Sequence, residues 1–158
     1  MKQLFTVLLA AGMLFVACDK NDDKNETLEN ETMTNQSFKG TLIVDLTDGS
    51  AYTQEDVTVD YAITDTAGFV LTFNQVSFSP RMPMKLDMSI PNVSYVIVGS
   101  EITLAGNGIV PLAMGKEFEQ YTITNLEGTI ADGTMSVSMK CGSSPMKFTG
   151  VKAETNRD

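Results

Sequence analysis

Histidine and tryptophan are absent from this chain of 158 residues, and cysteine occurs only twice. The lack of histidine removes the commonest general base, the commonest metal ligand and the usual sensor of physiological pH. Two cysteines, Cys18 and Cys141, are too few for the disulfide framework of small secreted domains. A thiol–imidazole pair is also excluded, so we expect Cys141 to be a small buried hydrophobic residue.

Basic residues are scarce as well. The chain has 11 lysines and arginines against 20 aspartates and glutamates, which gives a formal net charge of -9. A protein that binds a phosphate backbone needs a clustered basic surface, and none is visible in the sequence. We therefore expect no nucleic-acid partner.

The carboxylates do not form a recognisable site. Paired carboxylates can hydrolyse glycosides, and Glu55, Asp56 and Asp60 lie close together in the sequence, as do Glu117 and Glu119. Ordinary acidic residues also keep a sheet soluble, and nothing distinguishes these five from such residues. No spacing matches a calcium-binding loop. We expect no enzymatic activity, no cofactor and no metal.

The amino terminus has the pattern of a lipoprotein signal peptide. A short positive start is followed by an apolar run over residues 4–16, which is too short to span a bilayer as a helix. The run ends in a small residue before Cys18 and resembles a bacterial lipobox, with Phe15 where leucine is usual. We predict a signal peptide at 1–17 and a membrane anchor on the acylated Cys18. The alternative is an ordinary signal peptide with an incidental cysteine.

Residues 18–36 are predicted to be a disordered acidic tether, because they contain almost no large apolar side chain. The acidic cluster directly after Cys18 resembles the lipoprotein export signal of the Bacteroidetes. This resemblance implies an outer-membrane lipoprotein that faces the cell surface, with the periplasmic face as the alternative.

Beyond the tether, apolar residues recur at every second position, and no segment shows the helical period of 3.6. Such alternation indicates antiparallel strands with one packed face and one wet face. We predict about eight to ten strands in one domain at 37–153, followed by a disordered tail at 154–158. Clear alternation starts at Phe38, Val57, Met82 and Met135.

Two segments change face midway, near Asn74–Gln75 and near Asn125, and a β-bulge at each point would explain the change. Asn107–Gly108 and Asp132–Gly133 are typical of two-residue hairpin turns, because both central positions of a type I′ turn need positive φ. We therefore expect tight hairpins joined by curved strands.

The packed faces of these strands need a shared interior, which is provided by a closed barrel or a sandwich. The segments 38–40 and 148–150 both read Phe-x-Gly and lie at the two ends of the domain. Pairing between them would close the sheet and leave no free edge. We predict an all-β, antiparallel up-and-down barrel of about eight strands, with a β-sandwich as the second choice.

Several short motifs follow one another along the chain, at 38–42, 70–78, 82–84, 126–130, 139–142 and 148–150. In this order they resemble the calycin-like (lipocalin-like) β-barrel lipoproteins of the Bacteroidetes. The resemblance implies an eight-stranded barrel that can hold a small apolar ligand, and it implies no catalytic residue. The lipocalin Gly-x-Trp signature is missing, since the chain has no tryptophan.

We expect a binding module, with an apolar ligand in the barrel. Inward-facing methionines adapt to irregular shapes and could line such a pocket, or they could fill a narrow core. A filled core would indicate an interaction or structural lipoprotein that contacts glycans or a partner protein. The predicted pocket residues are Leu71, Phe73, Met84, Met88, Tyr121, Met135, Met139 and Phe148.

Asp65-Thr66-Ala67 resembles the O-glycosylation pattern of exported Bacteroidetes proteins, which makes Thr66 a candidate glycan acceptor on an exposed turn. The sequence leaves the oligomeric state and the identity of any partner open.

Overall fold

The computed structural model describes residues 35–154. The predicted signal peptide at 1–17, Cys18, most of the tether and most of the tail lie outside these residues. The described part contains ten strands and one short 3-10 turn. The strands are β1 (Asn35–Asp45), β2 (Ala51–Thr64), β3 (Gly68–Val76), β4 (Leu86–Val98), β5 (Glu101–Gly106), β6 (Leu112–Ala113), β7 (Lys116–Glu117), β8 (Ile123–Ala131), β9 (Thr134–Cys141) and β10 (Ser144–Lys152), and the turn η1 is Glu119–Tyr121.

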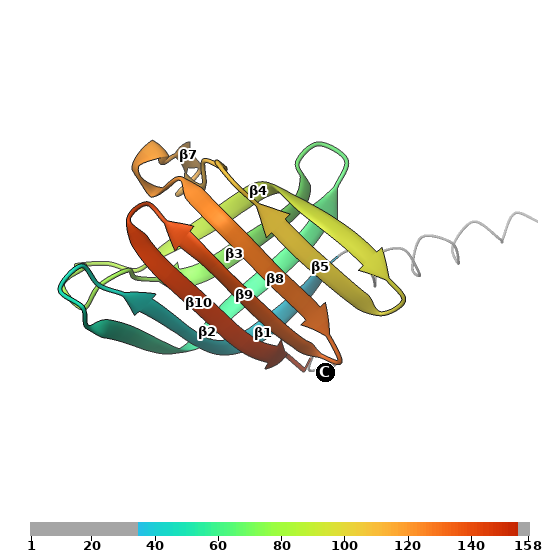
Figure 1. The fold of residues 1–158 in the computed structure, drawn as a ribbon, viewed down its shortest axis with the longest axis horizontal. Helices are drawn as coiled ribbons and strands as arrows, with labels where there is room; N and C mark the ends of the chain where they lie inside the picture. The colour runs from blue at the N-terminus through green and yellow to red at the C-terminus, as the bar shows by residue number, and fades with distance from the viewer. Residues whose placement is uncertain (1–34, 155–158) are drawn as a thin grey trace, which may run out of the picture.

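Eight of the strands form a closed antiparallel barrel (Figure 1). They follow one another in the order β3-β2-β1-β10-β9-β8-β5-β4, and a further pairing between β3 and β4 completes the ring. The short strands β6 and β7 form a hairpin that pairs with the beginning of β4. The predicted up-and-down barrel is confirmed, and this closure distinguishes it from a sandwich of two open sheets.

The two ends of the domain pair as predicted. Strand β1 runs antiparallel to β10, with Phe38 opposite Lys152 and Gly40 opposite Gly150. A Cβ on Gly40 would lie 2.0 Å from the carbonyl oxygen of Thr149, so this position accepts no side chain without a backbone shift. The two glycines therefore allow the strands that close the barrel to approach each other.

Four positive-φ residues mark irregularities within the strands. The register shifts predicted near Gln75 and Asn125 are confirmed, and both residues have positive φ, 52° and 51°. Two similar irregularities, at Asp56 and Asn92, were not predicted, although the pairing is shifted beside each of them. Bulges of this kind bend strands and so curl a sheet into a barrel.

The predicted turns have different outcomes. Asp132 and Gly133 both have positive φ and join β8 to β9 in a two-residue hairpin, as expected. The prediction of a hairpin at Asn107–Gly108 is wrong. The chain does not turn back there but continues antiparallel to β8 as far as a bridge between Ile109 and Ile123. The Asn107 side chain accepts a hydrogen bond from the backbone N–H of Asn125, so the irregular pair lies opposite the bulge of β8.

Side chains fill the interior. The largest fully buried ones come from seven of the eight barrel strands, and Phe73 of β3 meets Phe148 of β10 edge to face, with ring centroids 6.0 Å apart. Edge-to-face pairs contribute beyond the area that they bury. The completely buried large side chains are Phe38, Phe69, Phe73, Phe148, Leu42, Leu71, Met88, Ile90, Leu104, Ile123, Leu126 and Met135.

Candidate binding site at the open mouth of the barrel

The two ends of the barrel differ. One end, which we call the open mouth, contains the start of β1, the end of β10 and the turns that follow β2, β4 and β8. The opposite end, which we call the closed end, contains the long connections between β3 and β4 and between β5 and β8. The pairings of Phe38 with Lys152 and of Ile102 with Ile130 place these four residues at the open mouth.

An aromatic cluster of Phe78, Phe118 and Tyr121, which we call the stopper, covers the closed end of the barrel. The rings of Phe78 and Tyr121 lie 5.3 Å apart, and the ring of Phe118 stacks on Tyr121 at 5.8 Å. Behind them, buried Gln54 donates to the carbonyl of Gln75 and accepts from the N–H of Ser77. These hydrogen bonds tie the start of the β3–β4 loop to β2 and hold the stopper over the core.

A row of aromatic rings follows the wall at the open mouth. From β1 to β4 the rings are Phe38, Tyr61, Phe69 and Tyr95, with successive centroids 6.3, 5.0 and 5.3 Å apart. The first three are buried, whereas Tyr95 is 40% exposed. Burial also raises the pKa of the Tyr61 hydroxyl above its ordinary value.

A hollow of about 240 Å³ opens at this mouth. Its apolar side is formed by Phe38, Tyr61, Ile102 and Ile130, and its rim carries Gln36, Asp132 and Lys152 among other residues. A second hollow of about 550 Å³ adjoins it and shares Gln36, Tyr61 and Lys152. An apolar floor beneath a few polar groups is the usual composition of a small-molecule site.

The predicted pocket residues lie elsewhere. Leu71, Phe73, Met88, Met135, Met139 and Phe148 are buried in the core, and Tyr121 belongs to the stopper at the closed end. The prediction that Met84 faces inward is wrong, because it is 58% exposed in the loop before β4, which begins only at Leu86. The prolines and the short span before Leu86 favour a loop over an earlier start of the strand.

The residues of the open mouth were not predicted as a site. Phe38 and Tyr61 were expected on packed strand faces, and Ile102 and Ile130 belong to the same alternation. The sequence did not show at which end of the barrel each strand begins. It therefore did not show which inward-facing residues lie together at the open mouth.

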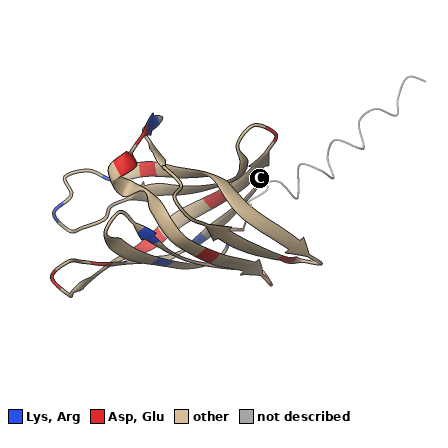
Figure 2. Cartoon of the chain, turned by 45° about the horizontal axis from the view of Figure 1, so that its top comes forward, with Lys and Arg blue, Asp and Glu red and all other residues tan. Residues whose placement is uncertain are grey.

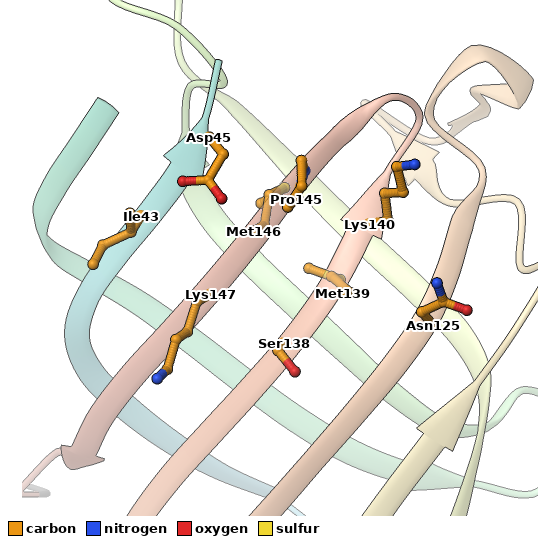
Figure 3. A pocket seen from close by; sticks show the side chains of 9 residues that line it. All are labelled: Ile43, Asp45, Asn125, Ser138, Met139, Lys140, Pro145, Met146 and Lys147. Atoms are coloured by element: carbon orange, nitrogen blue, oxygen red, sulfur yellow. The ribbon is translucent and has the colours of Figure 1, made fainter. Parts of the chain in front are cut away.

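A third hollow, of about 500 Å³, lies on the outer wall (Figure 3). It crosses the four neighbouring strands β1, β10, β9 and β8, and we call it the outer-wall hollow. Lys147 lies beside Ile43 and Asp45 at the β1 side of this hollow, and Lys140 lies at its other side, toward Asn125 (Figure 3). Met139 is the one predicted pocket residue that contributes to it.

Cys141 is buried as expected. Its Sγ lies 3.7 Å from the carbonyl oxygen of Tyr121, and desolvation raises the pKa of its thiol to about 12. A thiol with so high a pKa is a poor nucleophile at neutral pH. Thr66 lies in the three-residue turn between β2 and β3 and is exposed, which is the location that a glycan acceptor needs.

Charged side chains are spread thinly over the barrel. In the view of Figure 2, basic residues lie singly on separate strands and loops. Within residues 35–154, no group of three or more acidic or cysteine side chains lies close enough to hold a metal ion. This includes the carboxylates singled out in the sequence, Glu55, Asp56, Asp60, Glu117 and Glu119. Within the same range, no helix is long and apolar enough to cross a membrane.

The fold and the site together define a class of protein, the closed eight-stranded antiparallel barrel. Side chains fill its interior, the stopper covers its closed end, and a hollow lies at its open mouth. No protein-family model, curated protein or solved structure matches the chain.

Proposed function

We propose that this protein is a lipid-anchored binding module that holds a small apolar molecule, or the apolar part of a larger one, at the open mouth of the barrel. The observation that carries the proposal is the hollow formed by Phe38, Tyr61, Ile102 and Ile130 beneath a polar rim. Its volume of about 240 Å³ suits a ligand smaller than a typical drug molecule. A longer ligand would continue into the adjoining hollow of about 550 Å³.

The anchor on Cys18 and the outer-membrane or cell-surface location are part of the same proposal. They are supported by the signal-peptide pattern of the first residues and by the place at which the chain enters the barrel. Asn35, the first described residue, lies at the open mouth. Residues 18–34 separate the proposed anchor from Asn35, and a flexible chain of this length has a root-mean-square span of roughly 20–25 Å. The anchor would therefore keep the open mouth close to the membrane, where apolar ligands are concentrated.

The test uses the full chain, purified from cells that export it. Native mass spectrometry before and after solvent extraction reveals any bound molecule. Gln36 lies on the inward side of β1 at the rim of both hollows, so Gln36→Trp should fill the mouth. Ser136→Trp places the same ring on the exposed face of β9 and serves as the matched control.

We expect a bound mass on the wild-type protein and on Ser136→Trp, and its loss from Gln36→Trp with the fold retained by circular dichroism. A bare polypeptide mass for all three proteins would refute the assignment, provided that a neutral naphthylamine dye also fails to bind to them.

The second candidate is an interaction lipoprotein with a filled core. The outer-wall hollow favours it, because its lining combines two lysines and an aspartate with exposed Ile43, a surface that can contact a glycan or a protein. Under this alternative, Lys147→Glu abolishes cross-linking to a partner on intact cells, whereas Gln36→Trp leaves it unchanged. Opposite responses of the two variants would favour the open mouth.

A further inference from the structure

Strand β4 extends beyond its neighbour β3. The last residue of β4 that pairs with β3 is Val93, opposite Phe69, and the five residues Ser94–Val98 pair with β5 alone. Figure 1 shows the β4–β5 hairpin projecting from the barrel. Within residues 35–154, no strand pairs with the other side of Ser94–Val98, so we call this segment the free edge.

The free edge has the properties of a strand that is covered by a partner. Tyr95, Val96, Ile97 and Val98 are 40%, 61%, 52% and 72% exposed. Not one charged residue occurs between Asp87 and Glu101. Monomeric proteins normally protect such strands with a charge, a proline or a bulge within the exposed stretch. Here Pro91 and the irregularity at Asn92 come before the free edge and leave it regular.

We propose that the free edge pairs with the same segment of a second copy of this chain. The pairing is antiparallel about a two-fold axis at Val96, so that Val96 faces Val96 of the partner subunit and Tyr95 faces the partner's Ile97. A two-fold interface needs only one self-complementary patch, and an antiparallel strand is complementary to itself. The unpaired N–H and C=O groups of the edge would then form ladder hydrogen bonds.

Charge also favours this site. Two copies of a chain with a net charge of -9 repel each other, and the uncharged free edge lets two copies pair without placing carboxylates directly opposite each other. A membrane is a less suitable occupant of the edge, because hydrocarbon cannot satisfy the unpaired backbone groups.

The interface is small. Five paired residues bury less than the roughly 1,200–2,000 Å² of a stable complex, so the dimer should be weak and concentration-dependent in solution. It should be more complete where the chain is concentrated on a surface.

Disulfide trapping tests the register directly in the full-length chain expressed in cells. Residues directly opposite each other have Cβ atoms about 4.5–5.5 Å apart, within reach of a disulfide after a small adjustment. Val96→Cys should give a covalent dimer on a non-reducing gel. The control is Val151→Cys, because Val151 is also an exposed valine, 62% exposed, but lies on β10, which is paired on both sides. Val151→Cys should remain monomeric.

Sedimentation equilibrium of the purified chain in density-matched detergent provides the second measurement. Val96→Lys places two like charges on the two-fold axis and should weaken the dimer at least tenfold, whereas Val151→Lys should leave it unchanged. Monomers at every concentration, or equal trapping of both cysteine variants, would overturn the proposal. So would a monomeric Cys18→Ala protein whose binding to phosphatidylcholine vesicles is lost when Val96→Lys is added, since that result, obtained without the proposed acyl anchor, would make the edge a membrane contact.

Discussion

The contact between Phe73 and Phe148 offers a quantitative test of the filled interior. The two rings come from β3 and β10, are 0% and 1% exposed, and meet at an interplanar angle of 81°. Phe73→Leu and Phe148→Leu each keep an apolar side chain but remove the ring, which should lower the free energy of unfolding by about 1–2 kcal/mol. The ring pair itself should appear as a coupling energy of about 0.5–1.5 kcal/mol in the double-mutant cycle.

The assay is urea unfolding followed by far-ultraviolet circular dichroism, since the chain has no tryptophan to report by fluorescence. Phe118 lies in the stopper and stacks on Tyr121, so the cycle of Phe73→Leu with Phe118→Leu serves as the control and should be additive within about 0.5 kcal/mol. A coupling energy near zero between Phe73 and Phe148 would mean that the rings do not touch and that the barrel has an open interior.

Three further predictions concern the thiol, the closing strands and the anchor. Burial raises the pKa of the Cys141 thiol to about 12, so the folded protein keeps this proton, whereas the unfolded chain loses it above about pH 9. The free energy of unfolding should therefore fall as the pH rises from about 9 to about 12, and it should fall less steeply in Cys141→Ala than in the wild type. The same thiol should react with iodoacetamide at pH 8 only after unfolding by urea. Gly40→Val places a side chain against Thr149 and should lower the free energy of unfolding by about 3 kcal/mol or more, measured by urea unfolding, whereas a wild-type value would contradict the close approach of β1 and β10. Cys18→Ala should release the protein from the membrane fraction, and full retention there would rule out the lipid anchor.

The period-two alternation predicted the strands well because each strand has one face in a shared core. Residues such as Leu71, Met135 and Phe148 are buried for that reason. The bulge at Gln75 was predicted because the apolar face shifts by one residue there. The bulges at Asp56 and Asn92 escaped prediction, since polar neighbours conceal the change of face at Asp56 and Pro91 interrupts the pattern before Asn92.

The open mouth could not be predicted from the sequence, for a physical reason. Alternation tells which residues point inward, but the position of a residue along the barrel axis depends on how far each strand is staggered against its neighbours. Phe38, Tyr61 and Ile130 come together because of the registers of β1, β2, β8 and their partners. The continuation of the chain past Asn107 likewise follows from long-range pairing, on which local turn signals carry no information.

The pairing of β1 with β10 has a consequence for how the chain is made. The barrel closes only when the final strand docks against the first, with Phe38 opposite Lys152, so the contact that completes the core joins segments from the two ends of the domain. Contacts of such large sequence separation form late and slowly. A chain still emerging from the ribosome lacks β10 and cannot complete its core. It would therefore stay loosely structured during synthesis. Under the export proposed above, this is the state that threading through a channel requires, and the barrel would close only after the last strand has crossed.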